Sequence, residues 1–302
     1  MTLSVSHLIS INDLSVSDIE HLIQKAQSYK EVNIPTSLEK KNIFSLFFED
    51  STRTRTSFEL ATNKLGGDFI NWDVKNSSAN KGESLQDTVN TLNAMRPDAI
   101  IIRHSEYGAP QFVSTIASCP VINAGDSWNE HPSQALLDAM TIIEHFGSIK
   151  DKKIAICGDI AHSRVANSNM ILLSKLGAHI HIVAPPFLMP EKFPISDVTT
   201  FDNLEDGIAG CDVVMMLRNQ KERMKSGLIE SDEQFFNDFG LTKDRLQKAK
   251  DNAIVLHPGP MNRNVEIADE VADDLSVSYI LKQVENGVFM RMAIMDSLIN
   301  KE

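Results

Sequence analysis

The sequence has few of the features that mark several large protein classes. Its 302 residues include three cysteines, Cys119, Cys157 and Cys211, which lie far apart and form no CxxC pair. We therefore expect no disulfide framework and no zinc site, and a reducing cytoplasm suits this composition. The first residues show no charged segment followed by an apolar core, and no apolar run approaches the ~20 residues of a membrane-spanning helix. We expect a soluble cytoplasmic protein that does not bind a membrane.

Positive charge is also scarce. The chain has 29 Lys and Arg against 41 Asp and Glu, which gives a net charge of −12 at pH 7. This balance argues against a general nucleic-acid binder, whose binding surface would be basic. It does not exclude a small anionic ligand, because a few clustered arginines reverse the local field. No Ser-His-Asp order and no metal-ligand cluster is evident in the sequence, so we expect neither a hydrolase triad nor a metal or other cofactor.

Apolar runs alternate with amphipathic stretches in two successive series. The first series predicts strands over 43–48, 68–72, 99–103 and 121–123, with helices over 12–29, 54–65, 84–95, 111–117 and 135–145. The second predicts strands over 153–157, 179–184, 212–217 and 253–256, with helices over 164–176, 204–209 and 284–298. We expect Asn12 or Asp13 to cap the first helix.

This alternation predicts an α/β protein with two doubly wound parallel-sheet domains linked by helices. We expect the first domain over 1–133, the second over 134–283, and a C-terminal helix over 284–302 that packs back on the first domain.

The most informative stretch follows the first apolar run and reads Phe48-Glu49-Asp50-Ser51-Thr52-Arg53-Thr54-Arg55. The N-terminus of a helix favours anions because its N–H groups are unpaired and its dipole is positive there. Ser and Thr add short donors, and Arg adds a planar fork that suits phosphate or carboxylate. The stretch therefore indicates a phosphate-binding site. In the alternative, Ser51 or Thr52 is only an N-cap and the arginines lie in water.

Arginines follow several of the other predicted strands as well. In open α/β sheets, ligands bind beyond the carboxyl ends of the strands. The polar residues found there include Arg103, Arg164 and Arg218, and the histidines are His104, His131 and His257. This pattern predicts a substrate with several negative charges, and catalysis by positioning and electrostatic stabilisation.

Two motifs resemble those of a known family. The stretch over 48–55 is similar to the carbamoyl-phosphate signature of the aspartate and ornithine transcarbamoylases, and His131-Pro132-Ser133-Gln134 is similar to their second shared motif. The resemblance follows the family's order over nearly the whole chain. Three features resemble the aspartate branch: Ser133 where ornithine enzymes have Cys, the His257-Pro258-Gly259-Pro260 segment, and the loop over 217–223. A dicarboxylate also suits the arginines better than the ammonium of ornithine, although ornithine or another amino acid stays the alternative acceptor.

The resemblance implies roles for individual residues in transferring a carbamoyl group to aspartate. The phosphate would be held by Ser51, Thr52, Arg53, Thr54 and Arg103. The carbamoyl oxygen would receive donors from Thr54, Arg103 and His131, and the carbamoyl nitrogen would be held by Gln134 and the carbonyls of Pro258 and Gly259. The aspartate carboxylates would be held by Arg164, Arg218 and Gln220.

Two further residues imply an assembly. Ser77 and Lys81 match loop residues of the family that enter the neighbouring subunit's site, which implies a homotrimer with shared active sites and a catalytic and substrate-binding role for Lys81. Regulatory chains or other enzymes of pyrimidine synthesis are partners that the resemblance leaves open. Two other classes remain: a nicotinamide dehydrogenase, against which the absent G-x-G-x-x-G counts, and a non-catalytic relative acting as a scaffold, which would have lost the ligands retained here.

Overall fold

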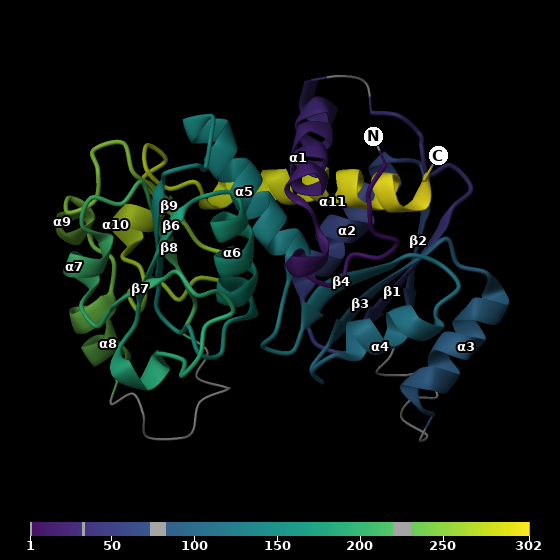
Figure 1. Ribbon diagram of the computed structural model, residues 1–302, viewed down its shortest axis with the longest axis horizontal. Helices are drawn as coiled ribbons and strands as arrows, with labels where there is room; N and C mark the ends of the chain where they lie inside the picture. The colour runs from purple at the N-terminus through teal and green to yellow at the C-terminus, as the bar shows by residue number, and fades with distance from the viewer. Residues whose placement is uncertain (1, 32–33, 73–82, 220–230, 302) are drawn as a thin grey trace. The chain divides into compact units, whose positions relative to one another are not determined.

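The computed structural model describes residues 2–31, 34–72, 83–219 and 231–301. Its contacts divide the chain into two units. Unit 1 comprises Met1–Leu137 and Glu285–Glu302, and unit 2 comprises Asp138–Val284. Both units consist of a parallel sheet with helices on its faces, so the predicted α/β class is confirmed (Figure 1).

Unit 1 is built on a four-stranded sheet. Its strands are β1 (Asn42–Phe47), β2 (Asp68–Trp72), β3 (Ala99–His104) and β4 (Val121–Asp126). They lie in the order β2-β1-β3-β4, and every neighbouring pair is parallel. The chain thus leaves β1 toward one side for β2 and returns to the other side for β3. The carboxyl ends of β1 and β3 therefore form a topological switch point, the place where such sheets bind ligands.

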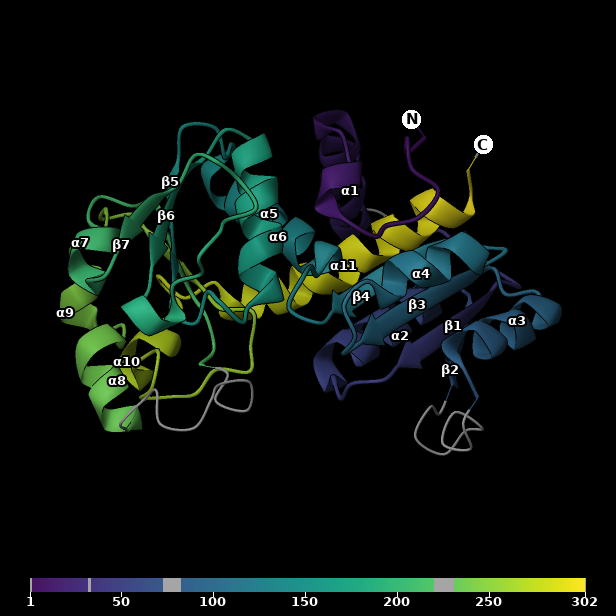
Figure 2. The ribbon, with the colours of Figure 1, turned by 60° about the horizontal axis from the view of Figure 1, so that its bottom comes forward.

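Helices cover both faces of this sheet. They are α1 (Val16–Glu31), α2 (Thr52–Lys64), α3 (Leu85–Met95) and α4 (Ala109–Ile116), preceded by the 3₁₀ turn η1 (Ile11–Asp13). Leu92 of α3 and Val113 of α4 join one hydrophobic cluster with Phe44, Leu46 and Ile102 of the sheet. α3 and α4 consequently pack on the same face, and α2 lies on the opposite one (Figure 2).

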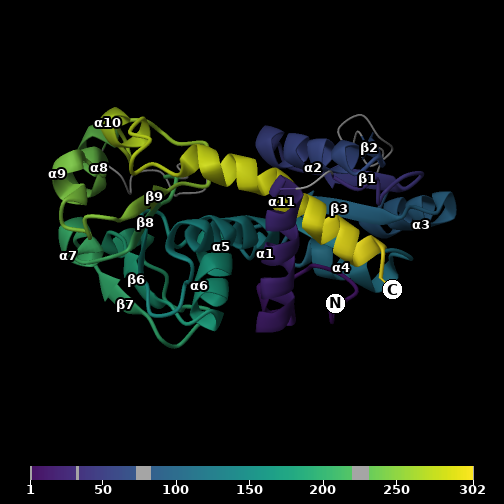
Figure 3. The ribbon, with the colours of Figure 1, turned by 90° about the horizontal axis from the view of Figure 1, so that it is seen from above.

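Two helices carry the chain from one unit to the other. They are α5 (Pro132–Phe146) and α11 (Ile280–Ile299). The C-terminal part of α11 belongs to unit 1, where Arg291 donates to Ser57 Oγ over 2.8 Å and Thr62 contacts Met295 (Figure 3). These contacts tie the end of the chain to α2.

The first helix begins later than the sequence suggested. Asn12 and Asp13 lie in η1, and α1 starts at Val16. Ser15 Oγ accepts from the Asp18 N–H over 3.1 Å, and the Asp18 carboxylate accepts from the Ser15 N–H over 3.0 Å. This reciprocal pair is a capping box, so the prediction of Asn12 or Asp13 as the cap of α1 was wrong.

Unit 2 is built on a five-stranded sheet. Its strands are β5 (Lys153–Cys157), β6 (His179–Val183), β7 (Thr199–Phe201), β8 (Val213–Met216) and β9 (Ile254–Leu256). They lie in the order β7-β6-β5-β8-β9, again all parallel, so the switch point falls between β5 and β8.

The helices of unit 2 also divide between two faces. They are α6 (Arg164–Lys175), α7 (Leu204–Ile208), α8 (Asp232–Phe239), α9 (Lys243–Leu246) and α10 (Asp269–Ala272), with the 3₁₀ turn η4 (Pro186–Leu188). Residues of α7 and α10, including Ile208 and Val271, share a hydrophobic cluster with Val214 and Val255 of the sheet. α6 lies on the other face (Figure 1).

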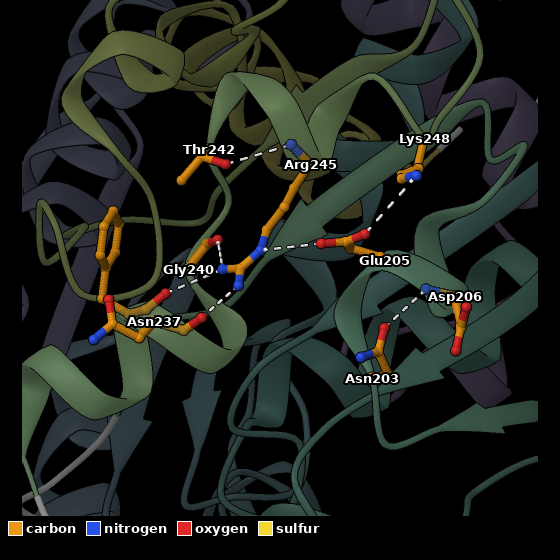
Figure 4. A network of polar contacts seen from close by, with 9 residues as sticks. Asn203, Glu205, Asp206, Asn237, Gly240, Thr242, Arg245 and Lys248 are labelled. Carbon is orange, nitrogen blue, oxygen red and sulfur yellow. Dashed lines mark hydrogen bonds and ion pairs between the residues drawn. The ribbon is translucent and has the colours of Figure 1, made fainter.

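Arg245 of α9 fastens the end of α8. Its guanidinium donates to the carbonyl oxygens of Gly240 over 2.6 Å and of Phe236 over 3.1 Å, and also to that of Asn237 (Figure 4). Helix carbonyls at a C-terminus lack partners in the helix, and a cation there satisfies them. Arg245 is thus a structural arginine.

Across the described ranges, the structure contains no helix long and apolar enough to span a membrane.

Candidate active site

The N-terminus of α2 follows β1 directly. Ser51 is the N-cap residue with φ −155° and ψ 84°, yet within the described chain its hydroxyl makes no capping hydrogen bond and the first turn contains no acidic residue. The first N–H groups of α2 therefore have neither a side-chain cap from Ser51 nor an internal carboxylate. A helix end of this kind is suited to an external anion, which favours the anion-site interpretation over the simple N-cap.

Arg103 is the penultimate residue of β3, beside β1. Phe47 and Arg103 are paired in register, and the Phe48 N–H donates to the Arg103 carbonyl over 2.9 Å. The guanidinium donates from Nε to Glu49 Oε2 over 3.2 Å and from Nη1 to the Ala124 carbonyl over 3.4 Å. These bonds fix the plane of the guanidinium at the same sheet edge as the N-terminus of α2.

His131 stands at the entrance of α5 and is 3% exposed. Its carbonyl accepts from the Gln134 N–H over 3.0 Å, and its Nδ1 lies 3.5 Å from Ser133 Oγ. The preceding residue, Glu130, is buried and accepts from the Ile11 N–H over 3.0 Å and from Ser10 Oγ. The carboxylate of Glu130 thus secures the turn that presents His131.

His104 has a different environment from its neighbour Arg103. The Glu106 N–H donates to His104 Nδ1 over 2.9 Å, and the ring centroid lies 4.4 Å from that of Phe48. Burial lowers the pKa of the His104 imidazole because it disfavours the charged form. A neutral His104 is therefore a packing residue beneath the strand ends.

Arg164 opens α6 at the carboxyl end of β5 and is buried. Ser163 caps the helix by accepting from the Ala166 N–H over 3.2 Å. The loop before it begins at Gly158, whose φ is 117° and where a Cβ would lie 2.9 Å from the Leu217 carbonyl. Only glycine fits this approach without a shift, since the backbone is left-handed and the strand end is close.

Arg218 follows β8, the neighbour of β5. The Leu217 N–H donates to the Cys157 carbonyl over 2.8 Å, which continues the pairing to the point where Arg218 emerges. Arg164 and Arg218 consequently stand at the ends of the two strands that define the switch point of unit 2.

The loop after β9 contains Pro258 and Gly259. Gly259 has φ 63°, and its N–H donates to Nδ1 of the buried His257 over 2.9 Å. The loop therefore turns back on the end of its own strand, next to β8 in the sheet.

Three of the candidate residues lie outside the described ranges: Ser77, Lys81 and Gln220. His162 Nδ1 lies 2.8 Å from Oδ1 of the buried Asp159, and Arg291 stacks on the Phe58 ring at 5.0 Å. No group of three or more His, Cys, Asp or Glu residues that could hold a metal ion occurs in the described ranges.

Sequence reasoning missed the carboxylates that support the candidate residues. Glu49 holds Arg103, Glu130 holds the turn before His131, and Glu266 holds His257. Glu49 lies within the stretch over 48–55, so its proximity to arginine was a usable signal. No sequence signal marks Glu130, because its partners are distant in the sequence, or Glu266, because it meets His257 across a loop.

The fold and the site together define a class of protein. Two doubly wound units each present arginine at a switch point, which is an arrangement suited to an enzyme that binds small polyanionic substrates. Residues 6–144 match the family model described as aspartate/ornithine carbamoyltransferase, carbamoyl-P binding domain, and residues 150–298 match the Asp/Orn binding domain of the same family. The chain belongs to the aspartate/ornithine carbamoyltransferase family.

Individual relatives agree with this assignment. The chain is 50% identical over 297 residues to the aspartate carbamoyltransferase catalytic subunit of Granulibacter bethesdensis, covering 97% of this chain and 94% of the relative. It is 33% identical to the catalytic subunit of M. jannaschii aspartate transcarbamoylase, with a TM-score of 0.87 and 99% of each chain covered. It is 32% identical to Trypanosoma cruzi aspartate transcarbamoylase crystallised with carbamoyl phosphate and aspartate, with a TM-score of 0.86, covering 97% of this chain and 96% of that one.

Proposed function

We propose that this chain transfers the carbamoyl group of carbamoyl phosphate to the amine of L-aspartate, giving N-carbamoyl-L-aspartate and phosphate. The observation that carries the proposal is the placement of arginine at the switch point of both sheets, Arg103 in unit 1 and Arg164 with Arg218 in unit 2. Membership of the family supports the same reaction. The relative with 50% identity is an aspartate carbamoyltransferase catalytic subunit, which supports aspartate as the acceptor.

The acceptor follows from charge. Aspartate has two carboxylates, and two arginines at neighbouring strand ends provide a cation for each. Ornithine carries an ammonium group, which Arg164 and Arg218 would repel. An aspartate-specific transferase is therefore the function that the arginines of unit 2 support.

The proposed chemistry needs few proton-transfer groups. The neutral amine of aspartate attacks the carbamoyl carbon and forms the new C–N bond. The tetrahedral intermediate then expels phosphate, which leaves with the electrons of the C–O bond and takes up the amine proton. Donors from Thr54, Arg103 and His131 would stabilise the oxyanion, a contribution of about a hundred- to a thousandfold in rate for each donor.

The other candidates complete the proposed binding set. The phosphate is held by Ser51, Thr52, Arg53 and Thr54 at the start of α2. The carbamoyl nitrogen donates to Gln134 and to the carbonyls of Pro258 and Gly259. Residues 1–133 then act as the carbamoyl-phosphate-binding domain and residues 134–283 as the aspartate-binding domain, with 284–302 returning to the first. The two units of the structure have similar bounds, with the division between Leu137 and Asp138 and between Val284 and Glu285.

The family resemblance also implies how the subunits assemble and in which pathway the enzyme acts. Ser77 and Lys81 would enter the site of a neighbouring subunit, Lys81 contacting both substrates, and Gln220 would assist Arg218. The working form is then a homotrimer of the cytoplasm that catalyses an early step of pyrimidine synthesis.

A product assay tests the function. The protein is incubated with carbamoyl phosphate and either aspartate or ornithine, and products are separated and identified by mass. We expect carbamoyl-aspartate from aspartate and little citrulline from ornithine. Arg218→Ala should abolish product formation, whereas Arg245→Ala should keep the preference for aspartate because its guanidinium is bound to the carbonyls of α8 (Figure 4). Citrulline as the main product would refute the assignment.

A further inference from the structure

His257 and Glu266 form a buried pair that the proposed chemistry does not use. Both side chains are fully buried, and His257 Nε2 lies 3.0 Å from Glu266 Oε1. A buried histidine and a buried carboxylate are costly to desolvate unless each makes good hydrogen bonds. The hydrogen bonds that these two side chains make to the loop over 257–262 therefore indicate their role.

The hydrogen bonds fix the tautomer of His257. The Gly259 backbone N–H can only donate, so His257 Nδ1, at 2.9 Å, must be the acceptor and carries no proton. The proton is then on Nε2 and is donated to Glu266. A neutral imidazole with one defined acceptor thus holds the N–H of the peptide unit that joins Pro258 to Gly259.

Glu266 holds the far side of the same loop. Its Oε1 accepts from the Asn262 N–H over 2.5 Å as well as from His257. The loop over 257–262 is therefore secured at both ends by one carboxylate oxygen. Gly259 supplies the left-handed residue, with φ 63°, that lets the backbone turn between these two anchors.

The pair is also connected to the interior of unit 2. The His257 N–H donates to Gln283 Oε1 over 2.9 Å, and Gln283 donates to Asp138 over 2.7 Å. Asp138 in turn accepts from Asn169 of α6 over 2.9 Å. The loop after β9 is thereby tied through buried side chains to the helix that begins with Arg164.

We propose that His257 is a positioning residue that aims the peptide carbonyl of Pro258, with Glu266 setting its tautomer and orientation. The inference rests on the proposed function, in which this carbonyl accepts from the carbamoyl nitrogen. The Pro258 carbonyl belongs to the same peptide unit as the Gly259 N–H, so the bond to Nδ1 sets the direction of that carbonyl.

The central test compares His257→Asn with His257→Ala. Asparagine keeps an oxygen acceptor near the place of Nδ1, whereas alanine removes it. We expect His257→Ala to lower kcat by about ten- to a hundredfold through misplacement of the Pro258 carbonyl, with little change in KM for carbamoyl phosphate, and His257→Asn to recover much of the loss. Both variants should show similar falls in Tm, since both lose the bond to Glu266. Equal kcat values in the two variants would overturn the proposal.

His181→Asn is the matched control in unit 2. His181 is a partly buried residue of β6, and its Nδ1 donates to the Gly207 carbonyl over 2.8 Å, away from the strand ends. This variant should lower Tm without lowering kcat. A loss of kcat as large as that of His257→Ala would mean that destabilisation alone explains both.

Hydrogen exchange tests the positioning without relying on activity. The Gly259 N–H should be protected in the wild type, retain part of its protection in His257→Asn and lose it in His257→Ala. Exchange at the same rate in the wild type and His257→Ala would refute the role of His257. A wild type that forms no carbamoyl-aspartate but shows this exchange pattern would instead refute the proposed function alone.

Discussion

At the scale of the residue, Arg103 shows how an arginine proposed for catalysis can be held rigid. Its Nε donates to Glu49 and its Nη1 to the Ala124 carbonyl, so two neighbouring segments fix the plane of the guanidinium. A planar fork held on one edge can direct its other donors to a ligand with little loss of side-chain entropy. Glu49 also balances part of the charge that accumulates at the strand ends.

Arg103→Lys should therefore not be a conservative change. Lysine keeps the charge but cannot make both supporting bonds and still present donors in a plane. We expect kcat to fall by about a hundred- to a thousandfold, as for removal of one oxyanion donor. The measurement is steady-state kinetics with carbamoyl phosphate and aspartate.

Arg96→Lys is the control for this change, because Arg96 is exposed at the C-cap of α3 and lies outside the proposed site. Its kcat should match that of the wild type. A comparable loss in both variants would show that the effect is not specific to the position of Arg103.

The arginines proposed to contact substrate could be located from the sequence, whereas most of the carboxylates that support the candidate residues could not. Arg103 lies at the end of an apolar run, and Arg164 and Arg218 follow such runs, so the strand-end rule finds them. Glu266 pairs with His257 through a loop turn that has no periodic signature. Such a supporting contact depends on how the folded loop brings two side chains together, and residue composition and spacing do not show this.

At the scale of the element, β7 is the one described strand that the sequence did not predict. β1, β3, β5 and β8 are nearly continuous apolar runs because both faces of a parallel sheet are buried. β7 is a three-residue strand at the edge of its sheet and has exposed threonines, so no apolar run marks it. The short helices α8, α9 and α10 were missed, whereas α4 and α7, which are equally short, were predicted. One or two turns show too little periodicity to predict such helices consistently.

The start of α1 is stabilised by side-chain hydrogen bonds. Asp18 is 5% exposed and accepts hydrogen bonds from Ser15 and from Ser4, whose N–H lies 2.9 Å from Oδ1. Burial would raise the pKa of the Asp18 carboxyl, but the hydrogen bonds from Ser15 and Ser4 outweigh it and lower the pKa to about 2.

Asp18→Asn should destabilise the protein in a pH-dependent way. Because the folded-state pKa lies below the unfolded one, the ionised carboxylate stabilises the fold above pH ~4, and this contribution falls as the pH drops toward ~2. We expect a loss of about 1–2 kcal/mol in unfolding free energy at pH 6, and a smaller loss at pH 3. Urea unfolding at the two pH values measures the difference.

Glu20→Gln removes an exposed carboxylate from the same helix and serves as the control. It should leave the unfolding free energy unchanged at both pH values. A deficit of Asp18→Asn that is equally large at pH 3 and pH 6 would contradict the assignment of the effect to an ionised Asp18.

At the scale of the whole molecule, the proposed donor and acceptor residues divide between the two units. Residues proposed for carbamoyl phosphate, such as Arg53 and His131, belong mainly to unit 1, and Arg164 and Arg218 belong to unit 2. In both units, the candidate residues lie at a switch point between two parallel strands, and a helix N-terminus follows one of these strands. On this proposal, substitutions at Arg164 or Arg218 alter acceptor binding and leave the residues proposed for phosphate in unit 1 unchanged.

The final prediction tests the proposed sharing of active sites between subunits. If Lys81 acts in the site of a neighbouring subunit, Lys81→Ala and Arg53→Ala homotrimers should each be nearly inactive. Random mixing after reversible dissociation should place an intact Arg53 beside an intact Lys81 in about a quarter of the sites of a closed symmetric trimer, and activity should recover to that fraction. The control mixes Lys81→Ala with the double variant Arg53→Ala/Lys81→Ala, which has no intact Lys81 and should recover nothing. Sedimentation must show mixed trimers in both samples, and mixed trimers that stay as inactive as their parents would mean that each subunit's site is complete by itself.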